Sequence, residues 1–232
     1  VVDRDGAHPV CRTHDIAASI GSRVHHDMPT WRTAETSMFV VADESHAYVT
    51  LPRRGCTEIW RIALKGPVEC TPVVTGERSC IVMDANARTR QLLYIASDLH
   101  KPWDLFLLDL DDNGRGREHA ITRLNDEVLA RWPKLEVRHL QLETPDGGLP
   151  LDAWFLARAD RAGPLPTVMF IHGGPNLATG HAFRFDLQLL AANGYACVFG
   201  NFGGSAGYGE PYRRAIMGDW GARGFPDHMA IV

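Results

Sequence analysis

The sequence has no long apolar run, no closely spaced cysteine pair and no large excess of charge of either sign. No apolar stretch reaches the length of a membrane span, so we expect no transmembrane helix. The net charge is −4 with both signs dispersed, which argues against nucleic acid or a membrane as partner. The cysteines are odd in number and form no CxxC pair, which favours reduced, buried thiols and a cytoplasmic location. They are Cys11, Cys56, Cys70, Cys80 and Cys197.

Both ends of the sequence lack the marks of a complete protein. No initiator methionine precedes Val1 and no signal peptide is visible, although a missing N-terminus would hide one. Residues 230–232 end inside an expected helix, without a cap or a polar tail. The 232 residues, 45% hydrophobic and 22% charged, suit one or two globular domains. We therefore expect a fragment of a longer protein.

The first 135 residues contain short apolar segments separated by turn residues, with little helical periodicity. Two segments recur at one offset: Tyr48 aligns with Tyr94 and Glu58 with Asp104, each pair 46 residues apart. A repeat of this length with several strands per unit is typical of β-propeller blades. About three such units would fit before residue 135, fewer than the roughly four to eight of a closed propeller. The others would lie upstream of Val1.

A group of potential metal ligands lies near the N-terminus. Its spacing fits no standard zinc pattern, so we expect solvated loop residues and no metal site. The group consists of Cys11, His14, His25, His26 and Asp27.

The second half of the chain has the pattern of an α/β sheet. Residues 135–158 alternate in polarity around a Pro-Asp-Gly-Gly turn, which predicts a hairpin. Apolar residues at 167–171 and 195–199 predict two buried strands, and residues 183–192 predict a helix between them, closed by Gly194. Strand, helix and strand with short connections form a βαβ unit of a parallel sheet. Downstream, we expect a short helix over 211–217, a break at 218–221, and a helix starting at Pro226 or Asp227.

Glycine-rich loops follow both predicted parallel strands. His172, Gly173, Gly174 and Pro175 leave the first strand, and residues 201–209 leave the second. Ligands of open α/β sheets bind beyond the carboxyl ends of the strands. Exposed backbone N–H groups of such loops can stabilise an oxyanion, and lipases and esterases use an HGG-type loop in this way. The alternative is a plain tight turn without a chemical role.

These motifs occur in a known order. IHGGP, then Gln188 in a helix, then ANGYACVFGNFGGSAGYG and AIMGDWG resemble the prolyl oligopeptidase family of serine peptidases, over roughly the last 90 residues. The resemblance is strongest to its acylaminoacyl-peptidase and dipeptidyl-peptidase-like branches. It implies a partial β-propeller over residues 1–135, followed over 136–232 by the truncated N-terminal half of an α/β-hydrolase domain. The implied reaction is cofactor-free cleavage of short peptides or N-blocked aminoacyl bonds by acyl transfer.

By the same resemblance, Gly174 occupies the position whose backbone N–H helps to bind the oxyanion. His172 occupies the place where other branches carry a tyrosine that does so with its hydroxyl group. Alternatively, His172 packs under the loop, and lone histidines more often serve such local hydrogen bonding. In the family, the nucleophile, acid and base follow the DWG segment, so we expect all three to lie beyond Val232 and this chain to be inactive.

Ser205 formally matches the G-x-S-x-G pattern of a nucleophile. A nucleophile elbow needs a helix directly after the serine, and residues 208–211 delay it. The only downstream histidine, His228, follows Asp227 directly, and adjacent helical residues point in different directions. The family comparison also places this segment before the nucleophile. We therefore expect Ser205 not to be the nucleophile.

The chain departs from the family at two positions. It has Gly203 where the family usually has Arg, and Gly224 where it usually has Asp. These losses remove charged groups that could brace the loops. The two losses favour one rival function, a non-catalytic module that binds through its propeller. A carboxylesterase with the same hydrolase core is another rival, because it would use the same mechanism.

Overall fold

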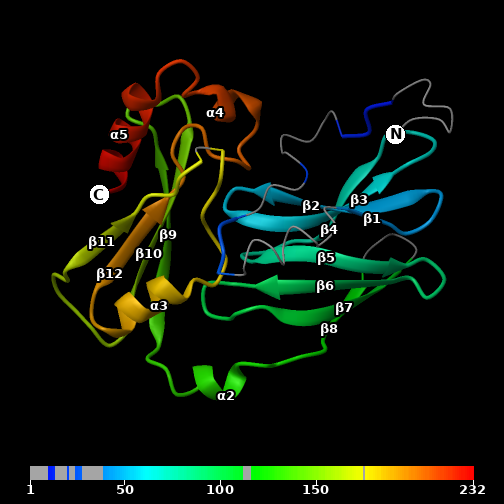
Figure 1. Ribbon diagram of the computed structural model, residues 1–232, viewed down its shortest axis with the longest axis horizontal. Helices are drawn as coiled ribbons and strands as arrows, with labels where there is room; N and C mark the ends of the chain where they lie inside the picture. Colours follow the sequence, from blue (N-terminus) through cyan, green and yellow to red (C-terminus); the bar gives the residue numbers. More distant parts are fainter. Residues whose placement is uncertain (1–9, 14–19, 21–23, 28–38, 112–115, 175) are drawn as a thin grey trace.

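The computed structural model describes residues 10–13, 20, 24–27, 39–111, 116–174 and 176–232. Its strands form two sheets that lie side by side (Figure 1). The first sheet is built from β1 to β8, and the second from β9 to β12. A short helix, α2 (Asp126–Leu129), lies in the connection between them.

The first sheet consists of two consecutive antiparallel meanders of four strands each. The first meander contains β1 (Phe39–Val41), β2 (His46–Arg53), β3 (Cys56–Ala63) and β4 (Cys70–Val74). The second contains β5 (Ser79–Asn86), β6 (Gln91–Ser97), β7 (Asp104–Leu110) and β8 (Gly116–Ala120). One parallel pairing, between Thr57 and Ser79, joins them.

The 46-residue repeat corresponds to these meanders. Tyr48 and Tyr94 lie on the second strand of each, and Glu58 and Asp104 lie on the third. Both tyrosines are buried in one apolar cluster between the meanders. The structure thus describes two four-stranded units, whereas about three were expected before residue 135. A further unit would fall in residues 1–38, most of which lie outside the described residues.

The second sheet has the order β11-β12-β10-β9. Its strands are β9 (Leu135–Glu143), β10 (Pro150–Arg158), β11 (Thr167–Phe170) and β12 (Ala196–Gly200). β9 and β10 form the predicted hairpin, and β11 and β12 are parallel, with α3 (Phe185–Ala192) between them in sequence. The predicted hairpin and βαβ unit are both confirmed.

The helix α3 begins at Phe185, two residues later than predicted. Arg184 has an extended backbone, and the Phe185 N–H donates to the carboxylate of Asp27 instead of continuing a helical turn upstream. The helix packs Leu187 into the core of the second sheet. Gly194 has φ +91°, as predicted for the residue that ends the helix.

The last helices depart further from expectation. The short helix α4 covers Glu210–Arg214, and α5 covers Trp220–Ile231. The prediction that the last helix starts at Pro226 or Asp227 was therefore wrong. Asp219 caps α5 by accepting a hydrogen bond from the Ala222 N–H at 2.9 Å, and Pro226 lies inside the helix. A good N-cap outweighs the glycines at 221 and 224 and the internal proline.

A turn of the first sheet docks on the second sheet. Gly55, in the β2–β3 turn with φ +76°, lies against Trp154 of β10, and its carbonyl accepts from the His181 N–H at 2.7 Å. Next to it, Arg54 donates two hydrogen bonds, of 3.1 and 3.2 Å, to the fully buried carboxylate of Asp152. These contacts place the turn against residues 180–181, in the segment between β11 and α3.

Trp154 is fully buried and donates through its indole N–H to His181 Nε2 at 3.1 Å. Burial lowers the pKa of His181 to about 4. The unfolded chain, with the usual pKa of 6.5, therefore takes up a proton first as the pH falls.

We expect this histidine to reduce the unfolding free energy progressively between pH 6.5 and about 4, by about 3 kcal/mol, because one pKa unit corresponds to ~1.4 kcal/mol. His181→Gln keeps an acceptor for Trp154 without titrating, so its stability should fall less over this range. Urea unfolding of both proteins at several pH values tests this; equal pH dependence would contradict it.

No helix among the described residues is long and apolar enough to cross a membrane. Cys80 and Cys197 are buried as expected, but the expectation was wrong for the other three cysteines, because Cys11 is exposed and Cys56 and Cys70 are half-buried. Burial raises the pKa of Cys80 to about 12 and that of Cys197 to about 11. Both thiols are thus protonated and unreactive at neutral pH.

Candidate functional site

The loop after β11 presents Gly173 and Gly174 at the carboxyl end of a parallel strand. Both are exposed, and neither backbone N–H donates to any other residue within the described part of the chain. Gly174 has φ +128°, and a Cβ atom there would lie 2.9 Å from the Asn176 nitrogen and 3.0 Å from the Leu177 nitrogen. Only glycine fits this conformation without strain.

His172, just before these glycines, is buried and turns inward. Its Nε2 lies 2.9 Å from the Ser205 Oγ, and its Nδ1 lies 2.9 Å from the Gly173 carbonyl oxygen. The ring also stacks on Phe202, with centroids 4.8 Å apart. Burial lowers its pKa, so the ring is neutral at pH 7. His172 therefore ties the HGG loop to the loop after β12.

Ser205 is fully buried, and its hydroxyl group lies 2.7 Å from the Phe202 carbonyl oxygen as well as next to His172. The chain stays irregular until α4 begins at Glu210. Ser205 therefore has neither the exposure nor the following helix that a nucleophile elbow requires.

Asp227 and His228 also fail to form a relay. The Asp227 carboxylate accepts from the Gly203 N–H at 2.8 Å, whereas His228 Nδ1 contacts the Gly224 carbonyl oxygen. The two adjacent side chains point to different partners, as expected. Asp227 instead fixes the start of the glycine-rich loop after β12.

The space beside Gly203 is occupied by an arginine from another element. A Cβ atom at Gly203 would lie 2.9 Å from the Cδ of Arg223, whose guanidinium binds the Asp146 carboxylate at 2.8 and 3.0 Å. Arg223 thus fills the space that a side chain at residue 203 would enter. Beside Gly224, the nearest atom is a ring carbon of Phe202 at 3.8 Å, which leaves room for a side chain.

Of the N-terminal group first considered as metal ligands, two members are described in structural roles. The His25 N–H donates to the Ala178 carbonyl oxygen at 2.7 Å, and Asp27 accepts from Phe185. His26 forms an edge contact with Trp103, and Cys11 is exposed. His14 lies outside the described residues.

One other set of side chains has suitable ligand types: Glu77, His139 and His181, whose ligand atoms lie within 4.8 Å of one another. A neutral imidazole has one acceptor nitrogen. That of His181 already accepts the Trp154 N–H, so a metal ion would have to displace this buried hydrogen bond. The prediction of no metal stays a prediction.

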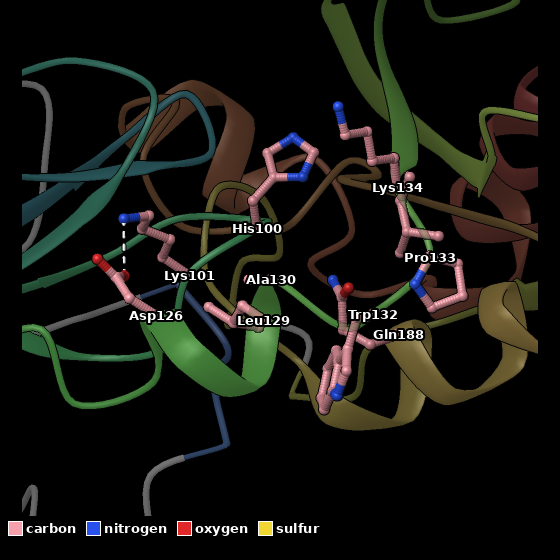
Figure 2. Close-up of a pocket in the computed structure, with 10 residues that line it drawn as sticks. His100, Lys101, Asp126, Leu129, Ala130, Trp132, Pro133, Lys134 and Gln188 are labelled. Carbon is pink, nitrogen blue, oxygen red and sulfur yellow. Dashed lines mark hydrogen bonds and ion pairs between the residues drawn. The ribbon is translucent and has the colours of Figure 1, made fainter.

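The pocket in Figure 2 lies away from the HGG loop. It has a volume of about 530 Å³ and lies where α2 and the following segment meet α3, beside the β6–β7 loop. Lys101 and Asp126 form an ion pair at 3.0 Å on one side, and Gln188 reaches it from α3. Because it contains none of the loop glycines, we do not assign it to the candidate site.

Sequence reasoning missed Asn201, the first residue after β12. Asn201 is fully buried and forms two hydrogen bonds with the backbone of Thr179. The sequence marks Asn201 only as the start of a glycine-rich loop, because its partner, Thr179, lies 22 residues upstream. A polar residue at the end of a buried parallel strand was the available signal.

The chain is similar to several known peptidases. Residues 181–232 match the profile of the prolyl oligopeptidase family. Over 86% of its length, the chain is 27% identical to the uncharacterized peptidase YuxL of Bacillus subtilis. Over its whole length it is 24% identical to dipeptidyl-peptidase 5 of Porphyromonas gingivalis. It spans 30% and 33% of these relatives, respectively.

Among solved structures, the fold is similar to that of the acylaminoacyl peptidase of Pyrococcus horikoshii, with a TM-score of 0.76 and 23% identity. The match covers 97% of this chain and 31% of that protein. A puromycin-hydrolyzing peptidase of Mycobacterium tuberculosis is also similar, with a TM-score of 0.61 over 84% of this chain.

The end of the chain, residues 181–232, thus matches the prolyl oligopeptidase family, and the chain as a whole is similar to proteins named as peptidases.

Proposed function

We propose that the protein to which this chain belongs is a serine peptidase that cleaves short peptides or N-blocked aminoacyl bonds by acyl transfer. The observation that carries the proposal is Gly174, whose exposed N–H has no partner among the described residues at the carboxyl end of β11. The named relatives include dipeptidyl and acylaminoacyl peptidases, which supports peptide substrates.

In the proposed reaction, a serine attacks the carbonyl carbon of the scissile bond and a histidine accepts its proton. The negative charge that develops on the carbonyl oxygen is stabilised by the Gly174 N–H. The C–N bond then breaks as the histidine gives its proton to the leaving amine, which leaves an acyl-enzyme ester on the serine. Water, deprotonated by the same histidine, hydrolyses this ester and restores the serine, and no cofactor is required. His172 contributes by holding the loop through Ser205, since its ring nitrogens are already engaged.

We also propose that the two meanders of β1 to β8 are adjacent blades of a β-propeller completed by further sequence. Their four-stranded antiparallel form and 46-residue period support this. The serine, acid and base are proposed to lie in further sequence as well. The chain by itself is then expected to be inactive.

An experiment on the protein with its flanking coding sequence separates the three functions. A peptidase cleaves an aminoacyl amide with kcat/KM comparable to, or above, that for a matched aryl ester, whereas a carboxylesterase cleaves only the ester. A fluorophosphonate probe should label the protein. Absence of both labelling and turnover would favour the non-catalytic binding module and contradict the proposal.

We expect Ser205→Ala to remain labelled by the fluorophosphonate probe, because Ser205 is buried and is not the nucleophile. The variant should lose about 1–2 kcal/mol of stability with the hydroxyl contacts to His172 and Phe202. Gel fluorescence and mass spectrometry of the labelled peptide test this. Loss of labelling in a folded variant, or a probe adduct on Ser205, would contradict it.

A further inference from the structure

Asn201 is placed to hold the far end of the HGG loop. It directly follows β12, and β12 pairs in parallel with β11, the strand from which the loop departs. Its main chain is anchored on both sides, because its N–H donates to the Asp152 carbonyl oxygen at 2.9 Å and its carbonyl accepts from the Tyr212 hydroxyl at 2.7 Å. The side chain is therefore presented from a fixed point of the sheet.

The Asn201 amide pairs with the backbone of Thr179 as a neighbouring strand would. Its Oδ1 accepts from the Thr179 N–H at 2.8 Å, and its Nδ2 donates to the Thr179 carbonyl oxygen at 2.9 Å. The second Nδ2 proton goes to the Tyr208 hydroxyl at 3.0 Å. Both hydrogen bonds between Asn201 and Thr179 are buried, so water cannot readily replace a lost partner there.

The HGG loop is thus held at two points with Gly174 between them. One point is the end of β11 at Phe170, and the other is Thr179. The segment near Thr179 has further ties: the Leu177 carbonyl oxygen accepts from the Ala206 N–H at 2.8 Å. Nearer Gly174, the hydrogen bond between His172 and Ser205 connects the loop to the loop after β12.

We propose that Asn201 is a positioning residue for the oxyanion-binding N–H of Gly174. The inference rests on the proposed function. A donor acts only when it is aimed at the developing oxyanion, and displacement by about 1 Å can cost a factor of about 10² in rate. Without the Asn201 clamp, Thr179 loses both of its hydrogen bonds to the end of β12. The far end of the loop then shifts, and the aim of the Gly174 N–H shifts with it.

The test uses the protein with its flanking coding sequence and two variants. Asn201→Leu removes both hydrogen bonds at similar size, and Asn201→Asp keeps the acceptor but places a second acceptor against the Thr179 carbonyl oxygen. Asn193→Leu is the matched control, because Asn193 is exposed at the end of α3 and its side-chain amide donates to the Leu189 carbonyl oxygen. Active sites are counted by fluorophosphonate titration, so that kcat refers to folded, reactive protein.

We expect both Asn201 variants to lose about 10²-fold in kcat with KM changed by less than about threefold. A peptide aldehyde, whose tetrahedral adduct places its oxygen at the oxyanion position, should bind about 10²-fold more weakly to these variants. Asn193→Leu should change neither constant.

Unchanged kcat and aldehyde affinity in titrated Asn201 variants would overturn the inference. A rise in KM with unchanged kcat would overturn it as well. If Asn201→Leu fails to fold, the near-isosteric Asp variant decides. A wild-type protein that neither reacts nor cleaves would instead refute the proposed function, and this inference with it.

Discussion

Replacing Gly174 with alanine is expected to lower kcat by about 10²–10³-fold, with KM close to that of the wild type. The added Cβ would lie 2.9 Å from the Asn176 nitrogen, and a non-glycine residue is strained at φ +128°. The backbone must therefore rotate, and the Gly174 N–H turns away from the carbonyl oxygen of the substrate. Steady-state kinetics of the protein with its flanking coding sequence measures the effect.

Gly173→Ala is the matched control for this substitution. Gly173 is the neighbouring residue of the same exposed loop, but a Cβ atom there would meet nothing within 4 Å. Its loss of kcat should stay below about tenfold. Wild-type kcat in Gly174→Ala, or equal losses in both variants, would contradict the assignment of the oxyanion donor.

Gly180→Ala is expected to lower the free energy of unfolding by about 3 kcal/mol or more. A Cβ atom at Gly180 would lie 2.1 Å from the carbonyl oxygen and 2.5 Å from the Cα of Gly55. Gly55 cannot yield, because its own Cα is packed against the Trp154 ring. The β2–β3 turn must then leave the second sheet, which also breaks the hydrogen bond from His181 to Gly55.

Thermal unfolding tests this prediction, and a loss of this size corresponds to a midpoint ~6–12 °C lower. Gly163→Ala is the matched control, because Gly163 has φ +86° but no atom within 4 Å of a Cβ. It should lose only the ~1–2 kcal/mol of backbone strain. Equal midpoints for the two variants would show that the close approach of Gly55 and Gly180 is not what holds the sheets together.

Local sequence patterns predicted much of the fold. The alternation around the Pro-Asp-Gly-Gly turn predicted β9 and β10, and the offset between Tyr48 and Tyr94 predicted equivalent strands in two meanders. These features depend on residues close in sequence, or on a repeat that can be read without knowing the contacts. The predicted start of α5 was wrong. Pro226 and two glycines favoured a later start, but Asp219 acts as the N-cap and the helix begins at Trp220.

The contacts that shape the candidate site could not be predicted in the same way. Asp152 binds Arg54 across 98 residues of sequence, and Ser205 contacts His172 across 33. Such pairs depend on how two sheets pack, which no local pattern encodes. The delay of the helix after Ser205 could be predicted from local sequence, and it is confirmed because α4 begins only at Glu210.

We propose above that the Gly174 N–H supplies half of an oxyanion-binding site. The most direct measurement is a crystal structure of the protein with its flanking coding sequence, bound covalently to a peptide aldehyde. We predict an adduct on a serine beyond residue 232, with its oxygen about 2.7–3.1 Å from the Gly174 nitrogen. An adduct on Ser205, or an adduct oxygen bound away from the HGG loop, would contradict it.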